Sequence, residues 1–183
     1  MLMRKRKARG FTLIELMITV AIAAILVILG IPAFNSTIKQ NRLATQVNEI
    51  VTMFNLARSE AVKRGNTVSV CTTSDQASCD DDATWAQGAI IFSDLNGDGS
   101  VDDDDVIIRV TDAMSGNSTV DYAGFGGDTI QFLPTGRTNS QNGTFTLCDS
   151  TADDEYARAI ILSATGRARL YINSGDSLSC TGS

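Results

Sequence analysis

An uncharged run of 23 residues near the N-terminus, Leu16 to Ile38, constrains this chain more than any other feature. A helix rises about 1.5 Å per residue, so this run is long enough to cross a hydrocarbon core of roughly 30 Å. Five basic residues lie within the first nine positions, and the positive-inside rule predicts that this end stays in the cytoplasm. We expect a single-pass membrane protein whose body lies outside the cytoplasm. The alternative is a cleaved secretory signal, which would need a shorter apolar core and a small-residue cleavage site after it.

The body is strongly acidic, and the chain contains no histidine. From Gly65 to the end there are five arginines and 18 acidic residues, a formal charge of −13. Histidine is the commonest general base and the commonest metal ligand, and the sequence also has no nucleophile elbow and no phosphate-binding loop. The sequence therefore argues against an enzyme, and its acidity argues against a typical nucleic-acid binder.

The helical pattern continues beyond the uncharged run. Apolar residues recur at spacings of four and three from Leu43 to Ala61, and Gly65 is a natural helix stop. We expect one helix from about Phe11 to Arg64, bent or loosened near Gly30 to Pro32, whose second half packs on a sheet.

After Gly65 the chain changes to short β-rich segments separated by Gly, Asn and Asp. The expected strands are 67–71, 88–92, 106–110, 129–132, 143–147, 158–162 and 168–172. This spacing is typical of antiparallel sheets, and one long helix in front of them makes the fold class α+β.

Glu15 is the one ionisable residue in the apolar zone that opens at Phe11. A charge there costs a few kcal/mol unless it is paired, so Glu15 is a functional candidate. The alternative is that its carboxylate snorkels to the membrane interface.

The residues around Glu15, Arg9 to Leu16, read RGFTLIEL after a short basic leader. This segment resembles the class III signal of type IV pilins and of type II secretion pseudopilins. The resemblance implies cleavage between Gly10 and Phe11 by a prepilin peptidase, followed by N-methylation of Phe11. It also gives Glu15 a partner, because its carboxylate would meet the cationic N-terminus of Phe11 on a neighbouring filament subunit and offset the desolvation of both charges.

Later segments narrow the resemblance to one family. Trp85 to Asp94 looks like the W-x-x-G-apolar-Asp segment of the GspH/FimT family of minor pilins and pseudopilins, and Phe132 to Arg137 and Ile160 to Arg167 also fit it. The resemblance implies a type IV pilin-like fold and a protein that enters, or primes assembly of, a type IV pilus or a type II secretion pseudopilus. Its partners would be other pilins or pseudopilins and the bacterial inner membrane, with the body in the periplasm.

Four parts of the chain follow from this resemblance. They are a leader peptide at 1–10, a transmembrane and filament-core half-helix at 11–34, an amphipathic half-helix at 35–64, and a periplasmic β-rich globular domain at 65–183. Whether the filament is a pilus or a pseudopilus stays open.

An even number of cysteines in an exported body indicates disulfides. Of the three connectivities open to four cysteines, we favour Cys71–Cys79, which closes a short loop, and Cys148–Cys180, which ties the C-terminal tail to a strand. The second resembles the C-terminal bridge common in pilins. The rival is a zinc site of four thiolates, but the chain has no C-x2-C pair.

The segment from Asp94 to Asp105 has the ligand spacing of a calcium loop. Oxygen-bearing side chains stand at loop positions 1, 3, 5, 7, 9 and 12, which are Asp94, Asn96, Asp98, Ser100, Asp102 and Asp105. The last ligand is Asp rather than Glu, and the flanks are β-like rather than helical. The alternatives are a calcium site and a solvated hairpin turn, because Asp, Asn and Gly are also turn residues.

Gly166 to Arg169 reads G-R-x-R, which resembles a DNA-contacting motif of FimT-like minor pilins linked to natural transformation. Arg167 and Arg169 share one face of the expected strand, and with Arg137 or Arg158 they could hold a phosphate backbone. The competing interpretation is that these arginines cover the sheet and pair with nearby acids. DNA binding is therefore the second function that the sequence suggests.

Overall fold

The computed structural model describes residues 11–125, 127–152, 154–171 and 178–180, except for the side chains at 29–33. The chain forms two compact units, Met1–Ile38 and Lys39–Ser183. The expected leader, at 1–10, lies outside the described residues. The backbone stays helical through Gly30 to Pro32, where a bend or loosening was expected, but the side chains at 29–33 are not described.

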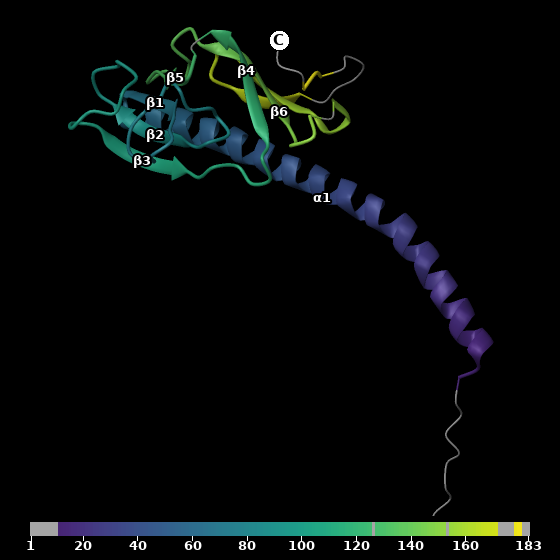
Figure 1. The fold of residues 1–183 in the computed structure, drawn as a ribbon. Helices are drawn as coiled ribbons and strands as arrows, with labels where there is room; N and C mark the ends of the chain where they lie inside the picture. The colour runs from purple at the N-terminus through teal and green to yellow at the C-terminus, as the bar shows by residue number, and fades with distance from the viewer. Residues whose placement is uncertain (1–10, 126, 153, 172–177, 181–183) are drawn as a thin grey trace, which may run out of the picture. The chain divides into compact units, whose positions relative to one another are not determined.

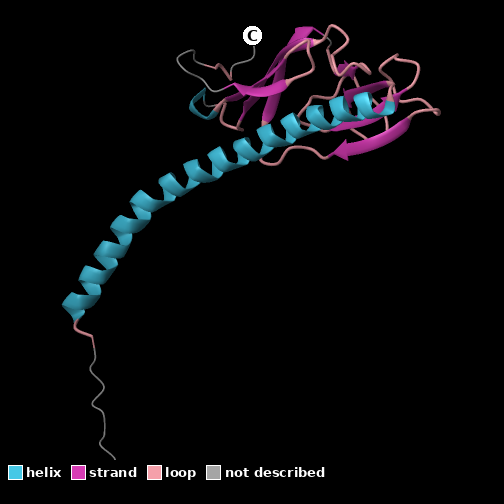
Figure 2. Ribbon diagram, turned by 180° about the vertical axis from the view of Figure 1, so that it is seen from behind, coloured by secondary structure: helices cyan, strands magenta, loops and turns pink. Residues whose placement is uncertain are grey.

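A single helix, α1 (Leu13–Arg64), forms where one helix from about Phe11 to Arg64 was expected (Figure 2). Thr12 caps it, because its Oγ1 accepts a hydrogen bond from the Glu15 N–H at 3.3 Å. Gly65 ends it with φ of +70°, and its N–H donates to the Ala61 carbonyl at 3.0 Å. The helix therefore begins two residues later than expected and ends where the glycine predicts.

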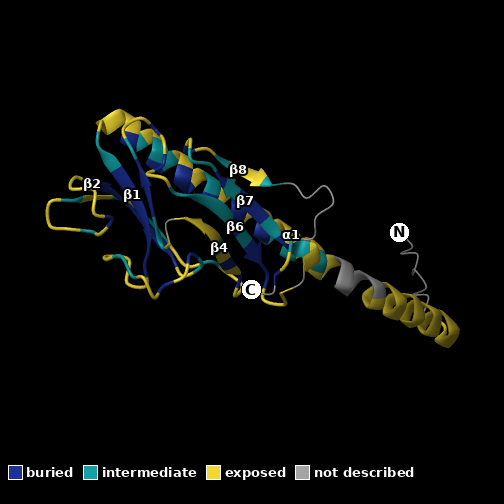
Figure 3. Cartoon of the chain, turned by 90° about the horizontal axis from the view of Figure 1, so that it is seen from above, coloured by how far each residue is buried: buried dark blue, intermediate teal, exposed yellow. Residues whose placement is uncertain are grey.

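In the described part of the first unit, the side chains of residues 11–28 are all exposed and those of 34–38 are mostly exposed (Figure 3). Phe11 is 81% exposed and Leu26 is 66% exposed. Among the described residues, we find no helix whose length and apolar content suffice for a membrane crossing. Residues 29–33, which fall inside the expected span, are among those whose side chains are not described.

The second unit contains two four-stranded antiparallel sheets (Figure 1). The first has the order β3 (Val106–Thr111), β2 (Ala89–Asp94), β1 (Thr67–Thr72) and β5 (Thr129–Phe132). The second has the order β4 (Thr119–Phe125), β6 (Asn142–Cys148), β7 (Arg158–Leu162) and β8 (Ala168–Tyr171), with a short 3-10 helix, η1 (Asp154–Tyr156), before β7. The α+β class and the seven expected strands are confirmed, apart from small shifts at the ends.

β4 was not among the expected strands. This strand reads TVDYAGF, and Asp and Gly are depleted in strands. Most of its residues are exposed, and only Val120 and Tyr122 on its inward face are apolar and at least partly buried, so the alternation is too short to stand out in the sequence. It forms because β6 offers a full antiparallel partner, from Thr119 opposite Cys148 to Phe125 opposite Asn142.

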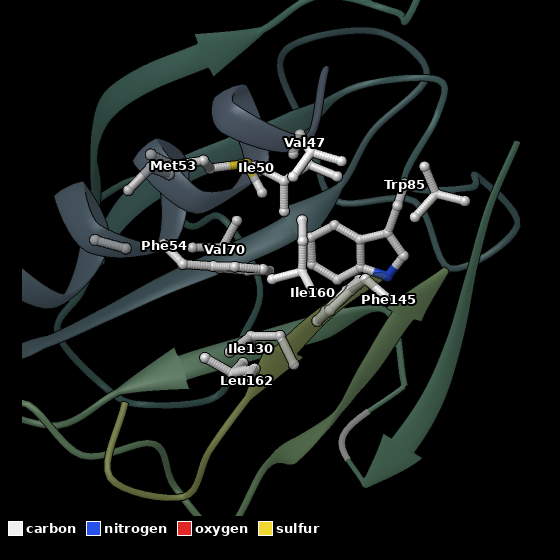
Figure 4. Packing of buried hydrophobic residues seen from close by; sticks show 14 of the residues in the cluster. Val47, Ile50, Met53, Phe54, Val70, Trp85, Ile130, Phe145, Ile160 and Leu162 are labelled. Atoms are coloured by element: carbon white, nitrogen blue, oxygen red, sulfur yellow. The ribbon is translucent and has the colours of Figure 1, made fainter. Parts of the chain in front are cut away.

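One core joins the helix to both sheets (Figure 4). The apolar stripe of the second half of α1 is buried as predicted: its members are Leu43, Val47, Ile50, Phe54, Ala57 and Ala61. At its centre, Phe54 lies 5.0 Å from Phe145 of β6 and 5.9 Å from Trp85, measured between ring centroids. Phe132 of β5 lies 6.2 Å from Phe54. The same helical face therefore fixes both sheets, which positions the loops described next.

Candidate functional site

The N-terminal candidates are partly described. Gly10 lies outside the described residues, while Phe11 and Glu15 are exposed. Thr12 and Glu15 have the T-x-x-E spacing of a capping box, in which residue N3 sits one turn after the cap. Within the described part of the chain, the Glu15 carboxylate has no cationic partner. The capping role was not among the expectations for Glu15, although the Thr-x-x-Glu spacing is a sufficient signal for it.

The arginine candidates lie on two turns of the same design. Leu133 to Arg137 and Ser163 to Arg167 each end in Thr-Gly-Arg. In the first, the Leu133 N–H donates to the Arg137 carbonyl and the Gly136 N–H donates to the Leu133 carbonyl, both at 2.8 Å. In the second, Ser163, Gly166 and Arg167 make the same two bonds, at 3.1 and 2.8 Å. The glycines have φ of +74° and +75°, a conformation that suits glycine.

The two turns touch each other. A Cβ added to Gly166 would fall inside the van der Waals contact distance of the Gly136 carbonyl oxygen. That same oxygen accepts a hydrogen bond from Nε of Arg58 on α1, at 2.8 Å. We call this arrangement the paired turns. Arg58 was not expected to be part of it, and in the sequence only the repeated Thr-Gly-Arg string indicates that the two turns are related.

The paired turns expose their arginines. Arg137, Arg167 and Arg169 are exposed, and none of them makes an ion pair within the described ranges. Arg169 lies in β8, while Arg167 comes just before that strand. Arg158 differs, because its Nη1 donates to the carbonyls of Tyr156 and Ala157 at 3.3 and 2.9 Å. The structure thus groups the turn of Arg137 with that of Arg167 and engages Arg158 with its own loop.

Both favoured disulfides are present in the structure. The short-loop disulfide joins Cys71 to Cys79, with Cα atoms 5.6 Å apart. The tail disulfide joins Cys148 to Cys180, with Cα atoms 5.7 Å apart. Because these bonds use all four cysteines, the structure gives no support to a four-thiolate zinc site.

Asp75 orders the loop that the short-loop disulfide closes. Its Oδ1 accepts hydrogen bonds from the N–H groups of Ser78 and Ala77, each at 2.8 Å. These donors, with Ser78 the stronger influence, hold the pKa of the Asp75 carboxyl well below its ordinary value of 3.8.

The acidic loop is organised around one buried carboxylate. Asp94 at the end of β2 is fully buried and accepts hydrogen bonds from the N–H groups of Gly97 and Gly99 and from Nε2 of Gln131. Asp105 closes the other end of the loop by accepting from the Leu95 N–H at 3.1 Å. Across the described residues, no group of three or more acidic, histidine or cysteine side chains is arranged to hold a metal ion. Calcium binding stays a prediction from the ligand spacing.

Two family models match the chain. The model described as type II transport protein GspH matches residues 46–166, and the model described as a prokaryotic N-terminal methylation motif matches residues 5–31. A comparison with curated proteins found no match.

Solved structures with a similar fold include two minor filament proteins. The type IV minor pilin FimU of Pseudomonas aeruginosa is 24% identical with a TM-score of 0.61, over 76% of this chain and 96% of that chain. The minor pseudopilin EpsH of the Vibrio cholerae type II secretion system is 12% identical with a TM-score of 0.52, over 75% of this chain and 99% of that chain. At these identities the likeness establishes the fold.

Proposed function

This chain belongs to the GspH family of minor pilins and pseudopilins, and on that premise we propose that it enters, or primes assembly of, a type IV pilus or a type II secretion pseudopilus. Proteins of this family assemble with other pilins in filaments. The methylation motif at 5–31 supports processing between Gly10 and Phe11 by a prepilin peptidase. The mature chain would then be held in the inner membrane by its apolar half-helix, with the body in the periplasm.

The observation that carries this proposal is the exposure of the first unit. From Phe11 to Ile28 the large apolar side chains are all more than half exposed: they are Phe11, Leu13, Ile14, Leu16, Met17, Ile18, Val20, Ile22, Ile25, Leu26, Val27 and Ile28. Such a surface is stable only when lipid or neighbouring apolar helices cover it. The bilayer would cover these side chains before assembly, and the apolar helices of neighbouring subunits would cover them in the filament core.

Substitutions of Glu15 test the assembly role. Glu15→Gln keeps a side chain that suits the capping box but removes the charge, whereas Glu15→Ala removes both. If Glu15 pairs with the N-terminus of Phe11 on a neighbouring subunit, both variants lose incorporation into sheared filaments while membrane insertion persists. Glu49→Gln, an exposed position farther along α1, is the matched control and should assemble normally.

Two outcomes would contradict the proposal. Normal incorporation of Glu15→Gln would show that Glu15 acts only as a helix cap. Absence of the wild-type chain from filaments, or retention of residues 1–10 in its intact mass when the peptidase is present, would remove the filament role itself.

DNA binding is the second candidate function, because the paired turns and the adjacent β8 expose three arginines, Arg137, Arg167 and Arg169, on an acidic body. Three phosphate contacts predict a slope of about −2.7 for log K against log salt on duplex DNA. In fluorescence anisotropy on the full chain, Arg167→Gln with Arg169→Gln should reduce this slope by about two. Arg109→Gln, an exposed arginine of β3, is the control. If the wild-type chain fails to bind DNA even at low salt, the arginines are structural.

A further inference from the structure

β3 has an unpaired edge. It pairs with β2 along one side, and no strand within the described residues lies along the other (Figure 1). Such an edge presents backbone N–H and C=O groups that can pair with another chain. Proteins usually protect an edge with lysine, proline or a covering element.

β3 has limited protection: one charge, and a register shift in its pairing with β2 between Ile91 and Phe92. It reads VIIRVT, with Arg109 as its one charge, and Val106 and Ile107 are 55% and 40% exposed. The guanidinium of Arg109 makes no ion pair within the described part of the chain. An apolar edge of this kind invites pairing, so it needs a cover in the assembled protein.

A groove of about 770 Å³ lies beside the C-terminal end of β3, between that strand and α1. Two polar atoms of its lining, Nε of Arg42 and Oε1 of Gln46, are buried and have no hydrogen-bond partner among the described residues. Gln46 itself is 3% exposed, and its Nε2 donates to the Ser115 carbonyl. An unpaired buried donor and acceptor are costly, so the body alone does not fully satisfy the polar groups beside this end of β3.

Charge identifies the kind of strand that fits. If β3 paired along its whole length with β3 of a second copy, antiparallel, Asp105 of each copy would face Asp112 of the other. Like charges directly opposite are destabilising, and residues 102–105 are four aspartates in a row. A second copy is therefore disfavoured, whereas a strand with lysine or arginine at the end facing residues 102–105 is favoured.

We propose that the free edge of β3 receives an extended segment of a different pilin or pseudopilin subunit, which adds to the sheet as a fifth strand with its basic end facing Asp102 to Asp105. The inference rests on the proposed filament role and specifies the contact. Main-chain hydrogen bonds to β3 provide the affinity, and the aspartates select the partner and its direction.

Photo-crosslinking in the native host tests this contact on the full chain. A benzophenone amino acid at Ile107 should form an adduct with another filament subunit, mapped by mass spectrometry to a segment with a basic residue beside an apolar run. The same probe at Phe125 is the control, because Phe125 is 73% exposed on β4, an edge strand of the other sheet.

Charge reversal tests the selectivity. Among the described hydrogen bonds that order the acidic loop, none involves the side chain of Asp103 or Asp104. The double substitution Asp103→Lys with Asp104→Lys should therefore leave the loop intact. We expect this variant to reduce the Ile107 adduct at least about fivefold. Asp81→Lys with Asp82→Lys makes the same change of charge on another exposed loop and should leave the adduct unchanged.

Four results would overturn the inference: no Ile107 adduct above the level at Phe125, an adduct with a second copy, an adduct with lipid or nucleic acid, or insensitivity to the charge reversal. Recovery of the wild-type chain in sheared filaments is measured in the same cells. If the chain is in the filaments and Ile107 gives no specific adduct, only this contact is wrong. If the chain is absent from them, the filament role fails separately.

Discussion

The contact between the paired turns predicts an unusually costly glycine substitution. Gly166 has φ of +75°, and alanine there costs about 1–2 kcal/mol for its backbone conformation alone. Its new Cβ would also collide with the Gly136 carbonyl oxygen, a backbone atom that Arg58 holds through a hydrogen bond. Crowding of this kind adds about 1–3 kcal/mol, so Gly166→Ala should cost about 2–5 kcal/mol in total.

Gly65→Ala separates the two contributions. Gly65 has nearly the same backbone conformation, with φ of +70°, but nothing lies within 4 Å of its added Cβ. It should therefore lose only the backbone part, about 1–2 kcal/mol. The assay is urea unfolding of the full chain in mild detergent, where a slope of about 2 kcal/mol/M converts the excess into a midpoint about 0.5–1.5 M lower for Gly166→Ala. Equal midpoints for the two variants would refute the contact.

Three further predictions concern the body. In the chain-entropy model, Cys148→Ser, which removes the tail disulfide, should lower the free energy of unfolding by about 3.7 kcal/mol, and Cys71→Ser, which removes the short-loop disulfide, by about 2.5 kcal/mol, because the loops span 32 and 8 residues. Non-reducing peptide mapping checks the pairing and unfolding curves check the two losses; a larger loss for Cys71→Ser would contradict the prediction. The pKa of Asp75 is lower in the folded than in the unfolded chain, so the stabilisation that its carboxylate gives is full above about pH 4 and is lost as the pH falls. Asp75→Asn should therefore lower the melting temperature at pH 7, and its melting temperature should approach that of the wild type near pH 2. A difference in melting temperature that stays constant with pH would be inconsistent with this linkage. Calcium at the acidic loop should give heat in calorimetry that Asp98→Ala weakens, and neither heat nor a thermal shift at millimolar calcium would favour the solvated turn.

The sequence predicted the elements whose signals are local. The stripe from Leu43 to Ala61 and the stop at Gly65 located the second half of α1, because burial on one face produces a period that can be read directly. β4 escaped because only Val120 and Tyr122 alternate on its inward face, and the strand forms against β6. Two inward residues are too few to give a period that can be read from the sequence.

The candidate sites show the same division. The disulfide pairing could be anticipated from the short loop and from the family resemblance. The paired turns could not, because Arg58 lies far from Gly136 and Gly166 in sequence and joins them only in the folded body. The unpaired edge of β3 was equally hidden, since strand order is set by tertiary packing.

The tail disulfide also decides how the body carries mechanical load. Residues 148–180 form a closed covalent loop that contains β7 and β8. A pull on the C-terminal end therefore passes at Cys180 into Cys148, at the end of β6, which lies inside its sheet between β4 and β7. Without the bond, the same force would act on β8, an edge strand that can peel away one pair at a time. A load applied at the C-terminal end thus bypasses the β7–β8 hairpin and the arginines it presents.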